Sequence, residues 1–454
     1  MFLDDVGIEH KAGLHRTMHK LEKRGGVIHG SLPTENIQTR TAPLWDPDQK
    51  LFKIWVTGTN DPYRTSPDGL HWQSGPNPEP DIHLGMVVRD PHDPDPNRRY
   101  KAAILSKGFS VSGDGIHWTK LDVGAISSSD EGNFSYNPKE GLFIHTVKRS
   151  GKYGRSLAAA TSTDFQNWTD HGLVFQADDL DQVLGHRRIE ARLRNPTLKQ
   201  TEYNNPAHYS VEIYNMGLFK YEGLFIGMPS MYHHTGKVAP GWEGFAKLRL
   251  SPYIQECVDT HGDYTGFYTI QMISSRDMKN WTRQGNREPL IETSPLGGGA
   301  YDLQTIIGPS EPVDRGDELW FYYTGIKQYA FVTSGGIPGY DDYVPHGAAI
   351  CLAVLRKDGF VSLEAEKEGT LLTPPFTLKG DKLFANVRGR KHGELRAEIL
   401  SSDGTVLARS KPLTGNHMNG RFEWETGSIA AQQDKTVRLH FTLRDGSFYS
   451  YWIE

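Results

Sequence analysis

Cysteine is scarce in this chain, and long apolar runs are absent from it. Only Cys257 and Cys351 occur, too few for a disulfide framework, and we expect both to be free thiols. No run of about 18 apolar residues exists, so no membrane-spanning helix is expected. Basic residues are not in excess either, because the formal net charge is −5. This charge gives no reason to expect nucleic acid or an anionic membrane as a partner.

An apolar leader is also missing at the start of the sequence. Met1-Phe2-Leu3 is followed at once by Asp4 and Asp5, where a secretory leader would continue with apolar residues. As it stands, the sequence therefore predicts a cytoplasmic protein. A leader removed by processing would leave the same sequence.

Aromatic residues, glycine and proline are plentiful. The chain holds 10 Trp, 20 Tyr and 19 Phe beside 48 Gly and 26 Pro. This mixture is typical of an all-β protein with many turns, in which most aromatic side chains pack between strands. Some could instead stack on sugar rings in a pocket. A length of 454 residues indicates two domains.

One phrase returns along the chain, with serine first, aspartate third and tryptophan last. Its copies begin at Ser66, Ser112, Ser162 and Ser275, and a degenerate copy begins at Lys357. In the first two copies Asp-Gly forms a tight-turn dipeptide, because Gly accepts positive φ and Asp bonds to its own backbone. The recurrence predicts a repeat architecture.

What precedes each copy also repeats, as a strand, a polar turn and an apolar strand. The turns contain the acids Asp46, Asp90, Glu140, Glu222 and Asp314. The serine–aspartate phrase then joins a third strand to a fourth. Four strands in each of five units predict an all-β fold, a five-bladed β-propeller followed by a small C-terminal β-sandwich.

We expect the propeller to span residues 1–369 and the accessory sandwich residues 370–454. A basic lead-in, residues 1–35, would lend a strand to the last blade and close the ring, which removes exposed edges. The expected blade ranges are 36–76, 82–121 and 128–175 for the first three and 297–368 for the fifth. The interval from Trp168 to Trp281 is too long for one blade and implies insertions at 176–207 and 233–264. These insertions would shape a binding rim or mediate a homo-oligomer.

Position within a blade separates functional acids from structural ones. Ligands of a propeller bind in the central funnel, where the first strand of each blade begins, so the turn acids after the first strands are interpreted as structural. Arg89-Asp90-Pro91 closes a first strand and Asn60-Asp61-Pro62 follows a second strand. We therefore interpret neither as a catalytic motif.

Polar residues that enter first strands are the candidate site. Converging carboxylates are costly unless they bind a cation or perform acid–base chemistry. The set comprises Glu35, Gln38 and Arg40 of blade one, Asp81 and His83 of blade two, Asp130, Glu131 and Asn133 of blade three, Glu212, Tyr214 and Asn215 of blade four, and Asp302, Gln304 and His346 of blade five.

These features resemble the five-bladed propeller glycoside hydrolases, which include families 43, 32, 117 and 130. The resemblance rests on the repeated phrase, Arg99-Tyr100-Lys101, Tyr221-Glu222-Gly223-Leu224, and Asp302 beside a Gly-rich loop. The C-terminal strands resemble the sandwich that follows the propeller in fructan hydrolases. The diagnostic catalytic motif of family 32 is absent, so the specificity of that family is not implied.

The resemblance to family 43 implies three funnel carboxylates, a base, a pKa-tuning Asp and a Glu acid. By position Glu35, Asp130 and Glu212 match best, although Glu35 replaces the usual Asp. Asp302 has no place in this trio and would bind substrate or a cation, or replace one of the three. The expected substrate-binding residues are Gln38, Arg40, His83, Asn133, Tyr214, Gln304 and His346.

We expect a glycosidase, exo-acting on a small or furanose-type terminal sugar of an oligo- or polysaccharide. Burial beside Ile213 and Tyr214 would raise the pKa of Glu212 and make it the general acid. No cofactor is expected, and the acids are compatible with a divalent cation such as calcium. The alternatives are a non-catalytic sugar-binding propeller, which needs no acid pair, and a glycoside phosphorylase. A phosphorylase would need a cationic phosphate site, for which His186-Arg187-Arg188 is a candidate.

Overall fold

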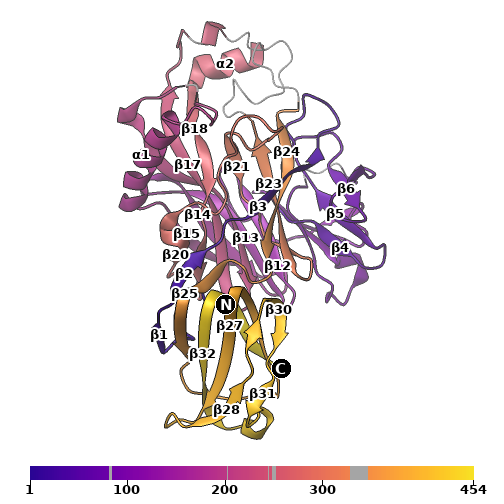
Figure 1. Ribbon diagram of the computed structural model, residues 1–454. Helices are drawn as coiled ribbons and strands as arrows, with labels where there is room; N and C mark the ends of the chain where they lie inside the picture. The colour runs from indigo at the N-terminus through magenta and orange to yellow at the C-terminus, as the bar shows by residue number, and fades with distance from the viewer. Residues whose placement is uncertain (81–83, 202, 244, 248–251, 328–345) are drawn as a thin grey trace. The chain divides into compact units, whose positions relative to one another are not determined.

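The structure is a computed structural model that describes residues 1–80, 84–201, 203–243, 245–247, 252–327 and 346–454. The candidates Asp81 and His83 lie outside these described residues. The chain forms two compact units, shown in Figure 1. The first consists of Leu21–Val313 and Trp320–Val354, and the second of Met1–Lys20, Asp314–Leu319 and Leu355–Glu454.

The first unit is a five-bladed β-propeller, as the repeats predict. In blades one to three, four antiparallel strands follow one another in chain order and lie within the predicted ranges. Blade one is β4 (Leu44–Asp46), β5 (Leu51–Trp55), β6 (Tyr63–Ser66) and β7 (Gln73–Ser74). Blade two is β8 (Val87–Arg89), β9 (Tyr100–Ile104), β10 (Gly108–Ser112) and β11 (Trp118–Lys120). Blade three is β12 (Gly132–Asn137), β13 (Leu142–Gly151), β14 (Gly154–Ser162) and β15 (Thr169–Phe175).

Blade four carries the two insertions. Its strands are β16 (Ser210–Tyr221), β17 (Leu224–Val238), β19 (Ile273–Ser275) and β20 (Thr282–Arg283), with β18 (Asp263–Ile270) paired to the far half of β17. Each insertion contains a helix that the sequence analysis did not predict, α1 (Asp179–Leu193) and α2 (Pro252–His261). The start of α1 is fixed by a capping box, in which Asp178 and Asp181 accept each other's backbone N–H.

Blade five is closed by the N-terminal lead-in, which confirms the predicted ring closure. Its strands are β21 (Thr305–Ile307), β23 (Glu318–Ile326), β24 (Ala348–Arg356) and β3 (Glu22–His29), with β22 (Val313–Asp314) paired to β23. β3 pairs antiparallel with β24, so the first and last parts of the ring share one sheet. Residues 361–368, predicted to end this blade, belong instead to a strand of the second unit.

The repeated phrase forms the same turn in four blades. In each copy the aspartate Oδ1 accepts the backbone N–H groups two and three residues later, at 2.7–2.9 Å. The first serine donates its hydroxyl to the same oxygen at 3.0 Å. The aspartate Oδ2 contacts His71, His117, Asn167 or Asn280 at 2.7–2.8 Å. The phrase therefore encodes a self-contained turn, which explains why it marks the architecture.

Acids between first and second strands join neighbouring blades. Asp46 forms an ion pair with Lys53 at 2.7 Å and accepts the hydroxyl of Tyr100, in the next blade, at 2.8 Å. Asp90 repeats the arrangement, since it accepts the hydroxyl of Tyr136 at 2.7 Å. Lys53 has only 1 % of its surface exposed, so its charge depends on Asp46. These contacts agree with the structural interpretation of the turn acids.

The second unit is one connected sheet of ten strands. Its order is β1-β25-β32-β27-β28-β31, and β2, β26, β29 and β30 pair at its margins. The strands are β1 (His10–Ala12), β2 (His15–Met18), β25 (Val361–Leu372), β26 (Phe376–Thr377), β27 (Leu383–Leu400), β28 (Val406–Ser410), β29 (Leu413–Thr414), β30 (Asn416–Arg421), β31 (Trp424–Thr426) and β32 (Thr436–Ile453).

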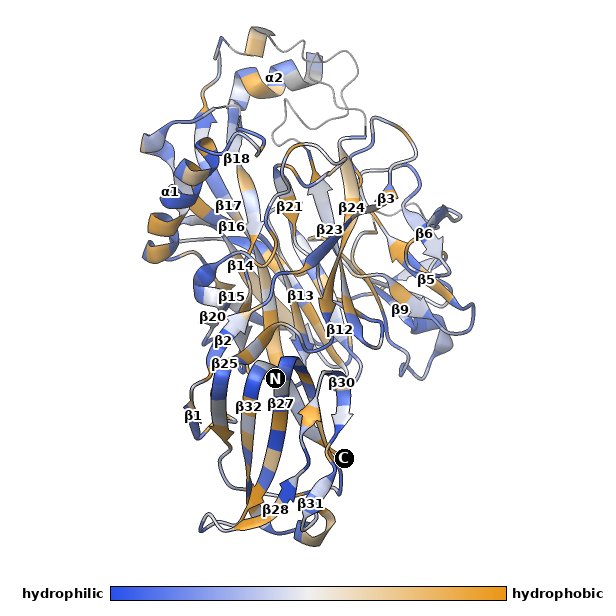
Figure 2. Ribbon diagram, viewed as in Figure 1, coloured by the Kyte–Doolittle hydropathy of each residue, from blue (hydrophilic) through white to orange (hydrophobic). Residues whose placement is uncertain are grey.

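The sheet of the second unit has one buried face along its longest strands. Buried and half-buried residues alternate over the last part of β27, from Leu395 onward, and Figure 2 shows them as alternating bands. This period of two is the pattern from which the C-terminal strands were predicted. The division between the units falls after Val354, not at the predicted boundary between residues 369 and 370, because β1 and β2 of the lead-in pair with β25. The two-layer packing of a sandwich stays a prediction.

Replacing Asp46 with Asn is expected to lower the free energy of unfolding by about 3–5 kcal/mol, because the buried ammonium of Lys53 loses its counter-ion. Glu222→Gln is the matched control: the ion pair of Glu222 and Lys139, at 2.9 Å, lies between two exposed side chains, and such pairs contribute little. Denaturant unfolding of both variants measures the difference. Equal losses in the two variants would contradict the structural role of Asp46.

Candidate active site

Two carboxyl groups stand where the first strands of blades three and four begin. Glu131 directly precedes β12, and Glu212 lies near the start of β16. Their side chains are 8 % and 15 % exposed. Each carboxyl is held by an arginine from elsewhere in the chain, Arg40 before β4 and Arg155 on β14, which is the arrangement expected of groups kept in a fixed orientation.

Glu131 is held from two other blades. Arg40 of blade one donates through Nε to Oε2 at 2.5 Å and through Nη2 to Oε1 at 2.6 Å. Asn215 of blade four donates to Oε2 at 3.1 Å, and Asn133 in turn donates to Asn215 at 3.2 Å. Gln38 accepts a further bond from Arg40 at 2.9 Å. Paired Arg–carboxylate bonds are short and geometrically specific. The position of Glu131 is therefore fixed relative to Arg40 and Asn215.

Glu212 is held by Arg155 and His234. Arg155 donates to Oε2 through Nη1 at 2.8 Å and through its backbone N–H at 3.1 Å. The Nε2 of His234 lies 3.2 Å from Oε1. Burial acts to raise the pKa of Glu212, but His234 and Arg155 outweigh it and lower the pKa to about 2. The direction of this shift is opposite to the one expected from burial alone, because Arg155 and His234, which sequence position did not reveal, favour the charged form of Glu212. The role of Glu212 as general acid stays a prediction.

Lys148 of β13 connects the surroundings of the two carboxylates. Its Nζ lies 2.7 Å from Asp130 Oδ1 and 3.7 Å from the ring centre of Tyr214. Burial lowers the pKa of Lys148, an effect that Glu131 and Asp130 oppose and Arg155 strengthens. Glu131 and Arg155, the arginine that binds Glu212, both act on this one ammonium, so the surroundings of the two carboxylates adjoin. Asp130 is exposed and takes part as the partner of Lys148.

Tyr214 projects into this site because β16 contains a β-bulge. Strand pairing passes from Ile213 opposite Met231 directly to Asn215 opposite Ser230, which leaves Tyr214 without a pairing residue on β17. A bulge redirects the side chain of the extra residue and is common beside active sites. The ring of Tyr214 is half-buried and meets Tyr268 edge-on, with ring centres 5.2 Å apart. The predicted substrate-binding role of Tyr214 fits this position.

Blade five holds its candidates in a different cluster. Asp302 is 3 % exposed, lies 2.7 Å from Lys23 Nζ and accepts the hydroxyl of Tyr323 at 2.8 Å. Gln304 is buried and donates to the carbonyl of Gly266 at 3.0 Å. The Asp302 carboxylate thus anchors the closing strand β3, which carries Lys23. The structure does not bring Asp302 into contact with Glu131 or Glu212.

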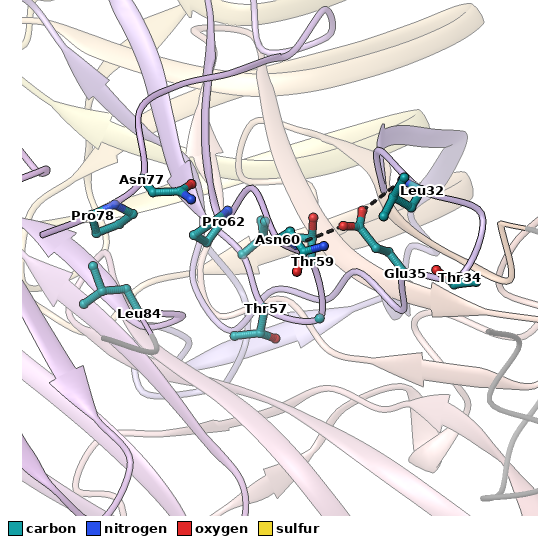
Figure 3. Close-up of a pocket in the computed structure, with 12 residues that line it drawn as sticks. Leu32, Thr34, Glu35, Thr57, Thr59, Asn60, Pro62, Asn77, Pro78 and Leu84 are labelled. Carbon is teal, nitrogen blue, oxygen red and sulfur yellow. Dashed lines mark hydrogen bonds between the residues drawn. The ribbon is translucent and has the colours of Figure 1, made fainter. Parts of the chain in front are cut away.

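Glu35 and His346 belong to loops at the rim of blades one and five. Glu35 accepts the backbone N–H of Asn60 at 2.9 Å and that of Leu32 at 3.2 Å, as Figure 3 shows. Burial acts to raise the pKa of Glu35, but these backbone bonds and the hydroxyl of Thr59 hold it below its usual value. His346 is exposed, and its backbone N–H donates to the carbonyl of Pro33 at 3.0 Å.

Two cavities adjoin this region. One, of about 840 Å³, is lined by Glu35 and the loop after β5. The other, of about 360 Å³, is lined by Arg40, Asp130 and Glu131. Thr57 lines both cavities, so the two approach the same residue of blade one.

Glu311 is a carboxyl whose pKa is raised, to about 8, by burial. The backbone N–H of Tyr136 bonds to it. Tyr136 lies five residues beyond Glu131 on the extended strand β12, a rise of about 16 Å. Glu311 is therefore at the other end of the first strand and takes no part in the site.

The sequence analysis missed several members of this cluster. It named Glu131 but placed the function on its neighbour Asp130, and it named neither Lys148 nor Arg155. The signal was weak, because Lys148 precedes Arg149 and Ser150 and Arg155 is the second residue of its strand, although both strands, Leu142–Gly151 and Gly154–Ser162, contain a short apolar run. A buried charge within such a strand indicates a partner elsewhere in the fold.

In the described part of the chain, no group of three or more His, Cys, Asp or Glu side chains is arranged to hold a metal ion. Likewise, no helix among the described residues is long and apolar enough to cross a membrane.

Comparison with known proteins finds neither a matching family model nor a matching curated protein. The solved structures with some similarity include the Bombyx mori GH32 beta-fructofuranosidase BmSUC1, at 10 % identity and a TM-score of 0.37 over 94 % of this chain and 93 % of that one. A thermostable family-43 glycoside hydrolase has 10 % identity and a TM-score of 0.37, over 75 % and 96 %. The endo-arabinase from Bacteroides thetaiotaomicron has 11 % identity and a TM-score of 0.32, over 66 % and 92 %. These neighbours are glycoside hydrolases of the kinds that the sequence resembles, and no site residue is transferred from them.

Proposed function

We propose that this protein is a glycoside hydrolase whose reacting carboxyl groups are Glu131 and Glu212. The observation that carries the proposal is that these two groups stand at the start of adjacent first strands, each oriented by an arginine. Hydrolysis of a glycosidic bond requires two carboxyl groups that flank it, with different protonation roles. The described surroundings of both groups supply that pair.

The environments of the two groups suggest their roles. The pKa of Glu212, about 2, leaves it ionised throughout the working range of most glycosidases, so Glu212 acts as nucleophile or as the base that activates water. Glu131 is then the second carboxyl of the pair, which transfers a proton to the departing oxygen once Arg40 gives up one of its two bonds to it. Arg40 and Asn215 orient Glu131 for that transfer. Asp130 and Lys148 form the charged wall between the two.

Glu35 and Asp302 are left outside the reacting pair on physical grounds. The oxygens of Glu35 already accept backbone N–H groups from Asn60 and Leu32. Asp302 is buried against Lys23 and Tyr323. Both carboxyls hold contacts within blades one and five, and no hydrogen bond or ion pair of the described residues joins either of them to Glu131 or Glu212.

The proposed substrate is a terminal sugar of an oligo- or polysaccharide, removed by exo action. Beyond Glu212 the site is filled by Arg155 and His234, and Tyr264 packs against His234 with ring centres 5.6 Å apart. On the side of Glu131, space continues into the two adjoining cavities. A site closed on one side and open on the other suits a chain end. We retain the small or furanose-type sugar that the sequence resemblance implies.

The cationic cluster His186-Arg187-Arg188 on α1 does not support the phosphorylase alternative. His186 Nε2 lies 3.1 Å from the carbonyl of Tyr209, and Arg188 donates to the carbonyl of Arg287 at 2.7 Å. Hydrolysis of a panel of aryl pyranosides and furanosides, with and without inorganic phosphate, distinguishes hydrolase, phosphorylase and binding protein. Activity that requires phosphate would assign a phosphorylase, and absence of turnover on every glycoside tested would contradict the hydrolase.

Substituting each carboxylate by its amide separates the two roles. On a glycoside with a poor leaving group, Glu131→Gln and Glu212→Gln are both expected to lose about 10²–10⁴ in rate. On a dinitrophenyl glycoside, whose leaving group needs no proton, Glu131→Gln should recover most of its rate and Glu212→Gln should not. Initial rates on the two substrates give the answer, with Glu222→Gln as the control for folding and expression. Full activity in either amide variant would remove that residue from the reacting pair.

The pH profile provides an independent check on Glu212. Arg155 helps to lower the pKa of Glu212, so Arg155→Ala is expected to raise that pKa. If the ionised form of Glu212 is active, protonation will then occur at a higher pH, and the acid limb of kcat/KM should move upward. Arg155→Lys, which keeps the charge, should move the limb less. An acid limb that stays in place in Arg155→Ala would show that Glu212 does not set it.

A further inference from the structure

The larger of the two cavities is positioned to extend the proposed site. It has a volume of about 840 Å³, within the range of 300–1,000 Å³ that small-molecule sites occupy. The smaller cavity, of about 360 Å³, already offers ligand-sized space beside Glu131. Because Thr57 lines both, a molecule that occupies the two would pass from Glu131 over Thr57 into blade one. Two adjoining ligand-sized spaces exceed what a single sugar requires.

The lining of the larger cavity favours a neutral, hydroxyl-rich ligand. Threonine hydroxyls and asparagine amides alternate with proline and leucine side chains around it. Figure 3 shows Asn77 and Pro78 on one side of this cavity and Glu35 with Thr34 on the other. The described lining residues include no lysine, arginine or histidine. The described lining therefore offers no cationic side chain to a phosphorylated or uronic-acid sugar, while it offers a neutral sugar donors, acceptors and apolar strips for its ring faces.

Glu35 gives this cavity its shape. Its carboxylate ties the loop at Leu32 to the loop at Asn60, through one backbone N–H from each. Glu35 is 7 % exposed. Its carboxylate therefore stabilises the two loops that line the cavity and has little surface left to contact a ligand. The carboxylate that the sequence suggested as a base is thus a positioning residue for the two loops.

We propose that this cavity binds a further neutral sugar unit of the substrate, so that the protein acts on neutral oligosaccharides in preference to single-sugar glycosides. The inference rests on the proposed function, since the neighbouring space is occupied by the sugar that is cleaved. It assigns the walls formed by residues 32–35, 57–62 and 77–78 to substrate length selection. It also gives Glu35 a role in affinity for long substrates.

The test compares an aryl glycoside of one sugar with neutral oligosaccharides of two to six units that carry the same terminal sugar. Asn77→Trp fills the cavity from an exposed position, so the fold should tolerate it. We expect the ratio of kcat/KM on oligosaccharide to kcat/KM on the aryl glycoside to fall about tenfold or more, since the extra unit loses its contacts. Thr119→Trp, at an exposed position on β11 outside the cavity, is the matched control and should keep the ratio of the unmodified protein.

Calorimetric binding of the same neutral oligosaccharides to Glu212→Gln separates this inference from the proposed function. Binding that Asn77→Trp abolishes would support the cavity even if no glycoside is hydrolysed. Equal affinity in proteins with and without Asn77→Trp, or affinity no greater for the longest oligosaccharide than for the monosaccharide, would overturn the inference even if hydrolysis is confirmed.

If Asn77→Trp does not fold, Thr34→Trp fills the cavity from another exposed position and decides by the same ratio. Glu35→Gln should raise KM for the oligosaccharide more than it lowers kcat, whereas general destabilisation would not separate the two constants.

Discussion

The ion pair of Arg40 and Glu131 is the contact on which the site depends. It joins blade one to blade three without passing through blade two, and Asn215 extends it to blade four. Both side chains are largely buried, so neither charge can be left alone without a large cost. The pair therefore fixes three first strands relative to one another, and the same contact positions the carboxylate proposed to react.

The rest of the ring is organised so that this pair can form. Hydroxyl groups connect first and second strands of different blades: Thr146 donates to the carbonyl of Met216 at 2.7 Å, and Ser230 accepts the N–H of Gly308 at 2.9 Å. Blades five and one are joined by the N–H of Thr39, which Thr324 accepts at 2.9 Å. The closing strand β3 then joins the start of the chain to the last blade through β24. Polar bonds around the axis leave the funnel hydrophilic, which suits a sugar ligand.

The architecture could be predicted because its signals are local. The serine–aspartate turn is complete within one phrase, and the strand pattern before it repeats, so blades one to three and the ring closure followed from short segments. The helices α1 and α2 were not predicted, because they lie in insertions of blade four that have no counterpart in the other repeats. The split of the lead-in between the two units depends on pairing of β1 and β2 with β25, across more than 300 residues, which no local pattern encodes.

The site was harder to predict because its charges meet only in the folded chain. Successive residues of an extended chain point to opposite faces, so the expected role of Asp130 and the proposed role of Glu131 concern neighbouring side chains with different contacts. The pKa of Glu212 depends on Arg155 and His234, which lie on other strands. Glu35 has the right residue type, but its oxygens are occupied by two loops whose approach the sequence does not show.

Chemical rescue tests the central claim most directly. In Glu212→Ala the ionised carboxylate is replaced by a space that azide can enter. If Glu212 is the nucleophile or the base, azide should restore turnover of a dinitrophenyl glycoside and yield a glycosyl azide, and the same addition to Glu35→Ala should change nothing. If azide rescues Glu35→Ala and has no effect on Glu212→Ala, the account is contradicted. Glu35 of blade one would then be the reacting carboxylate.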